Sequence, residues 1–314
     1  MIREAIEQLV AGQSLTTDEA AQVMTEIMQG EATPAQFGAF VTALRLKGET
    51  AQEIAGMARV MREMSLHVEF DGDLVDTCGT GGDGSGSFNV STAAAFVAAG
   101  AGATVAKHGN RAMSGATGSA DVLETLGVRI DLGPEGVKRC LEQVGFGFMF
   151  AQRYHPAMRF AAGPRREIGI RTVFNILGPL TNPANASRQV IGVADTGTGE
   201  RMAQVLVMLG SERALVVHGN DGMDEITVTD ASGIWDVKGG TVSTYQVTPE
   251  EVGLSRGSAD ALGASSKEHS AETVRAVLGG RPGPARDIVL MNAAAALVAA
   301  GNAASLEAGV RMAE

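Results

Sequence analysis

The chain has few aromatic residues, few cysteines and no excess of basic residues. Aromatic residues make up 4% of its 314 residues, so the core has to be built from Ala, Val, Leu, Ile and Met. The two cysteines, Cys78 and Cys140, are too few for a disulfide framework or a cysteine-based metal site, which is typical of the reducing cytosol. The formal net charge of −11 argues against nonspecific binding to nucleic acid.

Long hydrophobic runs and a targeting segment are also missing. The longest runs of small apolar residues, 92–106 and 292–304, are short and rich in alanine, whereas a membrane-spanning helix needs about 20 apolar residues. The first ten residues, MIREAIEQLV, contain acidic residues where a signal peptide has its apolar stretch. These patterns predict a cytoplasmic protein that has no membrane partner.

Glycine, in contrast, is abundant. The chain has 41 glycines in 314 residues, nearly double the usual share of about 7%. They follow no collagen-like period, so we expect them in tight turns and ligand-binding loops. They are densest in DTCGTGGDGSGSFNVST, residues 76–92.

The first 65 or so residues predict helices only. Capping boxes at 16–19 and 50–53 each begin a helix, and Thr33-Pro34 begins another. Gly30 and Gly48 end two of them. These short helices cannot bury a good core alone, so we expect them to pack on the rest of the chain, on a second copy, or on both.

From Leu74 onward, short apolar runs alternate with helical stretches, which predicts a mostly parallel sheet flanked by helices. The runs are 74–75, 103–106, 146–150, 190–194 and 214–217, and the helices start near Asn89, Ser119, Pro134 and Gly199. The segment 154–180 lacks strand character, and we expect its helices to return to the N-terminal bundle. The predicted fold is therefore α/β, with a small, discontinuous all-helical domain (1–68, completed by helices from about 154–186) and a larger α/β domain (72–314).

Two strand-end loops have the composition of anion sites. Glycines 79–86 lie between a predicted strand and a helix with its N-cap at Asn89, where backbone N–H groups and a helix N-terminus suit a phosphate or diphosphate. Their spacing matches neither a dinucleotide fold nor a P-loop. The next strand is followed by Lys107–Arg111 and by 114–121, with a predicted N-cap at Ser119. Together the loops could hold two phosphate groups, and a plain structural turn is the alternative for each.

Two further segments carry charged groups. Asp224 and Glu225 follow another predicted strand, and Mg²⁺ is commonly held by one or two carboxylates together with substrate phosphates. An exposed acidic turn is the alternative. Arginines in the segment 163–172 could clamp a carboxylate, or could form structural ion pairs.

Taken together, these motifs resemble those of the anthranilate phosphoribosyltransferase family. Four stretches carry the resemblance in the family's order: GTGGDGSGSFNVST, KHGNRAMSGATGSADVLETLG, GPRREIGIRTVFNILGPLTNP and HGNDGMDEIT. With the N-terminal helices they extend over essentially the whole chain. The resemblance implies a helical domain joined to a larger α/β domain, usually in a homodimer through the helical part. It also implies transfer of a 5-phosphoribosyl group from phosphoribosyl pyrophosphate (PRPP) to anthranilate, with release of pyrophosphate.

The resemblance also implies roles for individual residues. PRPP would be held by Gly79, Gly82, Asp83, Ser87, Asn89, Ser91, Thr92, Lys107 and Ser119. Two Mg²⁺ ions would be organised by Ser91, Asp224 and Glu225. Anthranilate would be received by Asn110 and Arg165, with Gly79 shared between the substrates and with His108 and His155 lining its path. Ala116 departs from the family, which often has a basic residue there, so a phosphate contact from that side chain is absent.

This reaction needs no covalent nucleophile. The aromatic amine of anthranilate is neutral at pH 7 and attacks without a strong base, so His108 and His155 are expected to orient or pack rather than to serve as an essential base. Cys78 is expected to pack behind the glycine loop.

Two other functions share this architecture. A pyrimidine-nucleoside phosphorylase binds one inorganic phosphate and has little use for the Asp224–Glu225 pair. A non-catalytic nucleic-acid-binding relative should have a basic surface and lack the metal ligands. The stretch HGNDGMDE argues against the phosphorylase, and the net charge of −11 with Ser91, Asp224 and Glu225 all present argues against the nucleic-acid-binding relative.

Overall fold

The structure, a computed structural model, describes residues 1–112 and 117–314. The expectations about Ser114, Gly115 and Ala116 therefore lie outside the described residues. Within the described ranges no helix has both the length and the hydrophobicity needed to cross a membrane.

The N-terminal residues form a helical bundle, as predicted. Its helices are α1 (Ile2–Val10), α2 (Thr17–Gln29), α3 (Pro34–Lys47) and α4 (Ala51–Glu63). Thr16, Thr33 and Thr50 each cap a helix through a complete capping box, which satisfies backbone N–H groups that have no partner within the helix. The predicted helix ends at Gly30 and Gly48 are confirmed.

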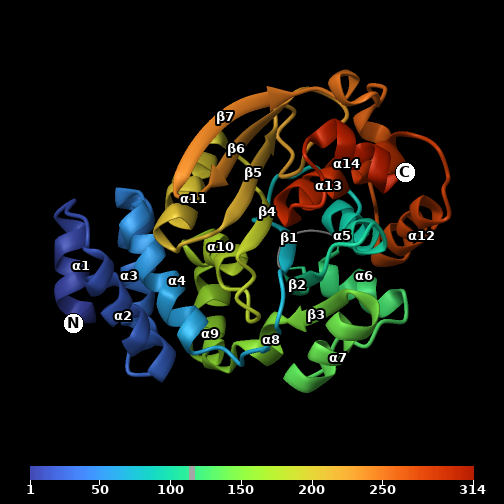
Figure 1. Ribbon diagram of the computed structural model, residues 1–314. Helices are drawn as coiled ribbons and strands as arrows, with labels where there is room; N and C mark the ends of the chain where they lie inside the picture. The colour runs from blue at the N-terminus through green and yellow to red at the C-terminus, as the bar shows by residue number, and fades with distance from the viewer. Residues whose placement is uncertain (113–116) are drawn as a thin grey trace.

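The rest of the chain is built around one sheet, in the order β3-β2-β1-β4-β5-β6-β7 (Figure 1). The strands are β1 (Val75–Gly79), β2 (Val105–Gly109), β3 (Phe146–Phe150), β4 (Arg188–Gly192), β5 (Arg213–Gly219), β6 (Ser232–Lys238) and β7 (Thr241–Val247). Strands β1 to β5 pair in parallel, whereas β6 and β7 are antiparallel. The prediction of a mostly parallel sheet is confirmed, but the β6–β7 hairpin was not predicted.

Helices cover both faces of the sheet. Successive residues of β5 point to opposite faces, so that Leu215 joins the core under α5 and α13 while Val216 joins the core under α11. Figure 1 shows α5, α13 and α14 on one side and α11 on the other. The helices are α5 (Val90–Gly100), α6 (Ser119–Thr125), α7 (Pro134–Val144), α11 (Thr196–Met208), α12 (Lys267–Leu278), α13 (Pro284–Ala300) and α14 (Leu306–Ala313), with short 3₁₀ turns η3 (Glu250–Val252) and η4 (Ala259–Ala261).

The segment expected to return to the bundle is helical. It contains α8 (Ala151–Tyr154), η1 (Pro156–Met158), α9 (Arg159–Ile168), α10 (Phe174–Leu177) and η2 (Gly178–Leu180). The Phe174 ring lies 5.4 Å from the ring of Phe37 in α3, and both belong to a hydrophobic core that also includes α11. The bundle and one face of the sheet thus share a continuous core.

Two predicted helix starts need correction. Gly118, not Ser119, is the N-cap of α6, because Asp121 accepts a hydrogen bond from the Gly118 N–H and fixes the turn one residue earlier. Helix α11 begins at Thr196 rather than near Gly199, because the Asp195 side chain caps it by accepting from the Thr198 N–H at 2.8 Å.

Candidate active site

A cleft of about 810 Å³ lies between the carboxyl ends of the parallel strands and the crossover helices α8 to α10. In open α/β folds the ligand commonly binds at this edge of the sheet. The glycine loop, the loop after β2 and the Asp224–Glu225 turn line one side, and α9 and α10 line the other. Met61 of α4 extends the lining to the bundle.

The acidic turn lies directly over the ends of two paired strands. Gly79 of β1 pairs with Gly192 of β4. A Cβ at Gly79 would overlap the Asp224 carboxylate, and a Cβ at Gly192 would overlap the Asp224 backbone carbonyl. Only a glycine at each position lets Asp224 approach this closely.

Both carboxylates accept backbone hydrogen bonds, Asp224 from the glycine loop and Glu225 from the first turn of α5. The Gly81 N–H donates to Oδ2 of Asp224 at 2.7 Å, and the Ser91 N–H donates to Oε1 of Glu225 at 3.2 Å. Burial and the nearby Asp83 raise the pKa of Asp224 to about 7, and burial and Asp224 raise the pKa of Glu225 well above its usual value. The two carboxyl groups are therefore harder to ionise than usual, because they are buried next to each other and near Asp83.

This donor set fits Mg²⁺. Among residues 1–112 and 117–314, no three His, Cys, Asp or Glu side chains are grouped closely enough to hold a metal ion by themselves. Mg²⁺ does not require such a group, since it is commonly bound by one or two carboxylates together with substrate phosphates. A divalent cation there would favour the ionised carboxylates of Asp224 and Glu225, against the burial that raises their pKa values.

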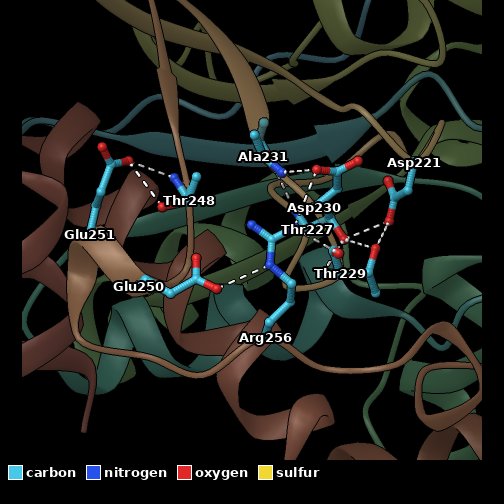
Figure 2. A network of polar contacts seen from close by, with 10 residues as sticks. Asp221, Thr227, Thr229, Asp230, Ala231, Thr248, Glu250, Glu251 and Arg256 are labelled. Atoms are coloured by element: carbon cyan, nitrogen blue, oxygen red, sulfur yellow. Dashed lines mark hydrogen bonds and ion pairs between the residues drawn. The ribbon is translucent and has the colours of Figure 1, made fainter.

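The turn that carries Asp224 and Glu225 is stabilised by hydrogen bonds to the Asp221 side chain. Asp221 accepts hydrogen bonds from the hydroxyls of Thr227, at 2.7 Å, and Thr229 (Figure 2). It also accepts one from the Met223 N–H at 3.2 Å. The same figure shows Arg256 joined to Glu250. The Asp221 contacts tie the start of the turn to Thr227 and Thr229, which follow Asp224 and Glu225, and so restrain the loop that carries the two carboxylates.

Lys107 is the buried cation of the site, with 1% of its surface exposed. Its Nζ donates to the Thr77 carbonyl and lies 3.3 Å from Oγ of Ser91. Burial lowers its pKa, while the negative charge of Asp76 works in the opposite direction. Asp76 itself accepts from Asn182 Nδ2 at 2.8 Å, so β1, β2 and the crossover segment meet at this point.

Asn89 and Ser119 join the two anion loops. Asn89 begins α5 but does not cap it with its side chain, because Oδ1 accepts instead from the hydroxyls of Thr117, at 2.7 Å, and Ser270, at 2.8 Å. The Ser119 hydroxyl lies where a Cβ on Gly109 would be, which makes glycine necessary at the end of β2. The loops are therefore adjacent, as the sequence predicted.

Two histidines face each other in the cleft, His108 from β2 and His155 from the crossover segment. The rings of His108 and His155 lie 5.0 Å apart, and among the described residues neither Nε2 has a hydrogen-bond partner. Burial lowers the pKa of His108 to about 3 and that of His155 to about 4, so both are neutral at pH 7. The Arg165 guanidinium lies 5.2 Å from the centre of the Phe174 ring, and Asn110 faces the cleft nearby.

The structure brings the predicted site residues together with one exception. Those lining the cleft are Gly79, Gly82, Asp83, Ser87, Asn89, Ser91, Lys107, His108, Asn110, Ser119, His155, Arg165, Asp224 and Glu225. Thr92 does not line it, because its side chain is fully buried in α5. Cys78, at the end of β1, also lines the cleft and packs against the core under α11, and burial raises the pKa of its thiol well above its usual value.

Several residues that build the site were not predicted. Gly192 could have been found only from its pairing with Gly79, and Asp76 and Asn182 only from the tertiary structure. Arg171, which also lines the cleft, lies in a predicted arginine-rich segment but was not singled out.

Comparison with known families defines the class first. Residues 3–65 match the helical bundle domain of a glycosyl transferase family, and residues 71–314 match the α/β domain of the same family. The fold and the phosphate-binding cleft described above are thus those of a two-domain glycosyl transferase.

The relatives define it more closely. The chain is 60% identical to the anthranilate phosphoribosyltransferase of Chloroflexus aurantiacus, covering 99% of this chain and 93% of the relative. It is 57% identical to the anthranilate phosphoribosyltransferase of Roseiflexus castenholzii, and the match covers 99% of this chain and 92% of the relative. The chain therefore belongs to the anthranilate phosphoribosyltransferase family, as the sequence motifs predicted.

Solved structures agree with this assignment. The crystal structure of the anthranilate phosphoribosyltransferase from Thermus thermophilus superposes with a TM-score of 0.93 at 46% identity, over 98% of this chain and 93% of the other. The Saccharomyces cerevisiae enzyme, solved in complex with PRPP and Mg, superposes with a TM-score of 0.90 at 27% identity, over 100% and 92%.

Proposed function

We propose that this cleft transfers the 5-phosphoribosyl group of PRPP to the amine of anthranilate, a step of tryptophan biosynthesis. The products are N-(5-phosphoribosyl)anthranilate and pyrophosphate. The observation that carries the proposal is the contact between the Asp224–Glu225 pair and the glycine loop. A phosphate-binding loop and a Mg²⁺-type carboxylate pair share one surface there.

PRPP would lie across the two adjacent anion loops. The residues proposed to hold it are Gly79, Gly82, Asp83, Ser87, Asn89, Ser91, Thr92, Lys107 and Ser119. Thr92 is kept as predicted from the family motif, although its side chain is buried and its N–H donates to the Asn89 carbonyl at 3.2 Å. The diphosphate would lie on the glycine loop, beside Asp224 and Glu225.

Ser91, Asp224 and Glu225 are proposed to hold two Mg²⁺ ions that accompany the substrate. When bound, Mg²⁺ supplies positive charge that stabilises pyrophosphate as a leaving group. The chain contributes the braced carboxylates and the loop N–H groups.

Anthranilate would enter along the opposite wall. Arg165 and Asn110 are proposed to orient its carboxylate, Gly79 to contact both substrates, and His108 and His155 to line its path. Arg165→Ala should therefore raise the KM for anthranilate by about tenfold or more, since a charge-assisted contact is lost, with a smaller change for PRPP. Steady-state kinetics with each substrate varied would measure this, and equal changes for both would contradict the role.

The chemistry follows from this arrangement. The bond between C1 of the ribose and the diphosphate oxygen breaks, and its electron pair leaves with pyrophosphate. A bond forms between C1 and the anthranilate nitrogen, which then loses a proton to solvent. Neutral His108 and His155 are not needed as a base, and the protein lowers the barrier by positioning and electrostatics.

The reaction is tested by its stoichiometry. The protein is mixed with PRPP, anthranilate and Mg²⁺, and the two products are quantified by chromatography and mass spectrometry. Equal amounts of phosphoribosyl-anthranilate and pyrophosphate, formed only with the metal, are expected. Cleavage of a pyrimidine nucleoside by phosphate, without turnover of anthranilate, would instead indicate a nucleoside phosphorylase.

A homodimer through the N-terminal helices is also proposed. An apolar groove of about 680 Å³ runs between α1 and α3, and at its edge Val10 and Leu46 are 74% and 83% exposed. A second copy of this chain would remove that surface from water.

The domain boundaries and the compartment are proposed as predicted from the sequence. Residues 154–186 would complete the helical domain of 1–68, because Phe174 and Leu177 share its core. The cytoplasm would be the compartment, in keeping with the free thiols of Cys78 and Cys140.

A further inference from the structure

Arg171 extends from the opposite side of the cleft and contacts the glycine loop. It follows the end of α9, in the segment that leads into α10. Its Nη2 donates to the Thr80 carbonyl at 3.2 Å. Its guanidinium lies so close to Gly82 that a Cβ there would overlap it. The crossover segment and the phosphate loop are therefore in direct contact through one cation.

The charge of Arg171 is not balanced by a carboxylate. Among residues 1–112 and 117–314, no Asp or Glu oxygen lies within ion-pair distance of it, and Thr80 O is its one hydrogen-bond acceptor. Arg111 and Arg188, in contrast, are each paired with two carboxylates. A guanidinium has five N–H donors, so most of those on Arg171 are available to a ligand.

The position of Arg171 indicates which part of the ligand it would meet. Gly82 is next to Gly81, whose N–H is bound to the Asp224 carboxylate. The diphosphate of PRPP carries the metal ions, so it is the group proposed to lie beside Asp224. Arg171 contacts this same stretch of the glycine loop, so we expect it to meet the diphosphate. Ser119 belongs to the other anion loop.

We propose that Arg171 binds the diphosphate group of PRPP and of the pyrophosphate product, an inference that rests on the function proposed above. A planar guanidinium matches two phosphate oxygens at once. As the C1–O bond breaks, its electron pair passes to the diphosphate oxygen, and Arg171 stabilises the added negative charge. Because Arg171 belongs to the crossover segment, a diphosphate bound to both Arg171 and the glycine loop also links the two.

The test is a binding measurement that does not depend on turnover. Isothermal titration calorimetry with pyrophosphate and Mg²⁺ is carried out on the wild type, Arg171→Gln and Arg171→Lys. Ribose 5-phosphate is titrated in the same way, as the probe for the ribose 5-phosphate part of PRPP. Arg281→Gln, at an exposed arginine between α12 and α13, is the control for loss of one positive charge. Urea unfolding of each variant shows that it is folded.

Arg171→Gln should weaken pyrophosphate binding by about 10- to 100-fold, which is the range for loss of hydrogen bonds to a charged group. Binding of ribose 5-phosphate should change less than about twofold, and Arg171→Lys should recover part of the loss. Unchanged pyrophosphate affinity in Arg171→Gln would overturn the proposal, whatever its stability. A loss confined to ribose 5-phosphate, or equal losses for both probes, would overturn it as well.

The outcome separates this inference from the function on which it rests. A wild type that forms phosphoribosyl-anthranilate, together with an Arg171→Gln variant of unchanged pyrophosphate affinity, refutes only the role of Arg171. A wild type that makes no product from PRPP and anthranilate refutes the proposed function itself.

Discussion

The buried pair His108 and His155 makes the stability of this protein depend on pH in a calculable way. Their rings lie side by side, with 7% and 6% of each residue exposed. Burial lowers both pKa values, to about 3 for His108 and about 4 for His155. For His108, the neighbouring His155 lowers the pKa further. In the unfolded chain a histidine has a pKa of about 6.5.

The direction of the effect follows from proton binding. Between about pH 4 and 6.5 the unfolded chain binds more protons than the folded protein, so the free energy of unfolding rises with pH and falls as the solution is acidified. For His155 the loss between pH 7 and pH 5 is about 2 kcal/mol. Asp76, whose pKa burial raises to about 6, works in the opposite direction by about 1 kcal/mol.

A histidine variant isolates this contribution. His155→Asn cannot be protonated, while Asp76 is present in both proteins and its effect cancels. The free energy of unfolding by urea is measured at pH 7 and pH 5 for wild type and variant, with His269→Asn at an exposed position as a matched control. The loss on acidification should be about 2 kcal/mol smaller in His155→Asn. The same loss in wild type and His155→Asn would mean that this histidine is charged in the folded protein, and the reasoning would fail.

Three further predictions concern the acidic turn and the proposed dimer. Asp224→Asn with Glu225→Gln should lower Mg²⁺-dependent turnover at least about 100-fold, because the charge beside the diphosphate is lost, and a double variant of full activity would contradict the metal assignment. Gly192→Ala places a methyl group against the Asp224 carbonyl and should lower the free energy of unfolding by about 1–3 kcal/mol and raise the KM for PRPP. Gly100→Ala, with open space around its Cβ, is the control, and equal effects of both would refute the steric argument. Leu46→Glu should yield monomers in analytical ultracentrifugation, and a dimer as tight as the wild type would exclude this groove as the interface.

Local chemistry made much of the fold predictable. The capping boxes that begin at Thr16 and Thr50 need only residues within four positions, so the bundle helices were located correctly. The β6–β7 hairpin was missed although a local signal was present. Gly239 and Gly240 both have positive φ and connect the two strands, as in a two-residue hairpin turn. Strand β7 was not predicted because nearly all of its residues are exposed, so its sequence lacks the alternation of apolar and polar residues that marks a half-buried strand.

The site was predictable where it depended on loops that follow strands. Because the carboxyl ends of parallel strands meet at one edge, the glycine loop, Lys107 and Asp224 had to converge once the parallel sheet was predicted. The contact of Gly192 with Asp224 depends on the register of β1 with β4, which are 113 positions apart in the chain at the paired residues Gly79 and Gly192. Arg171 reaches Gly82 across the cleft, and no local pattern encodes that contact.

The transfer reaction is tested most simply by following the fluorescence of anthranilate after the protein is mixed with PRPP, with and without Mg²⁺. We expect a rapid loss of fluorescence that requires the metal, because the amine of anthranilate becomes bonded to the ribose. No loss in the presence of Mg²⁺, with the protein folded and PRPP still bound, would contradict the proposed transfer.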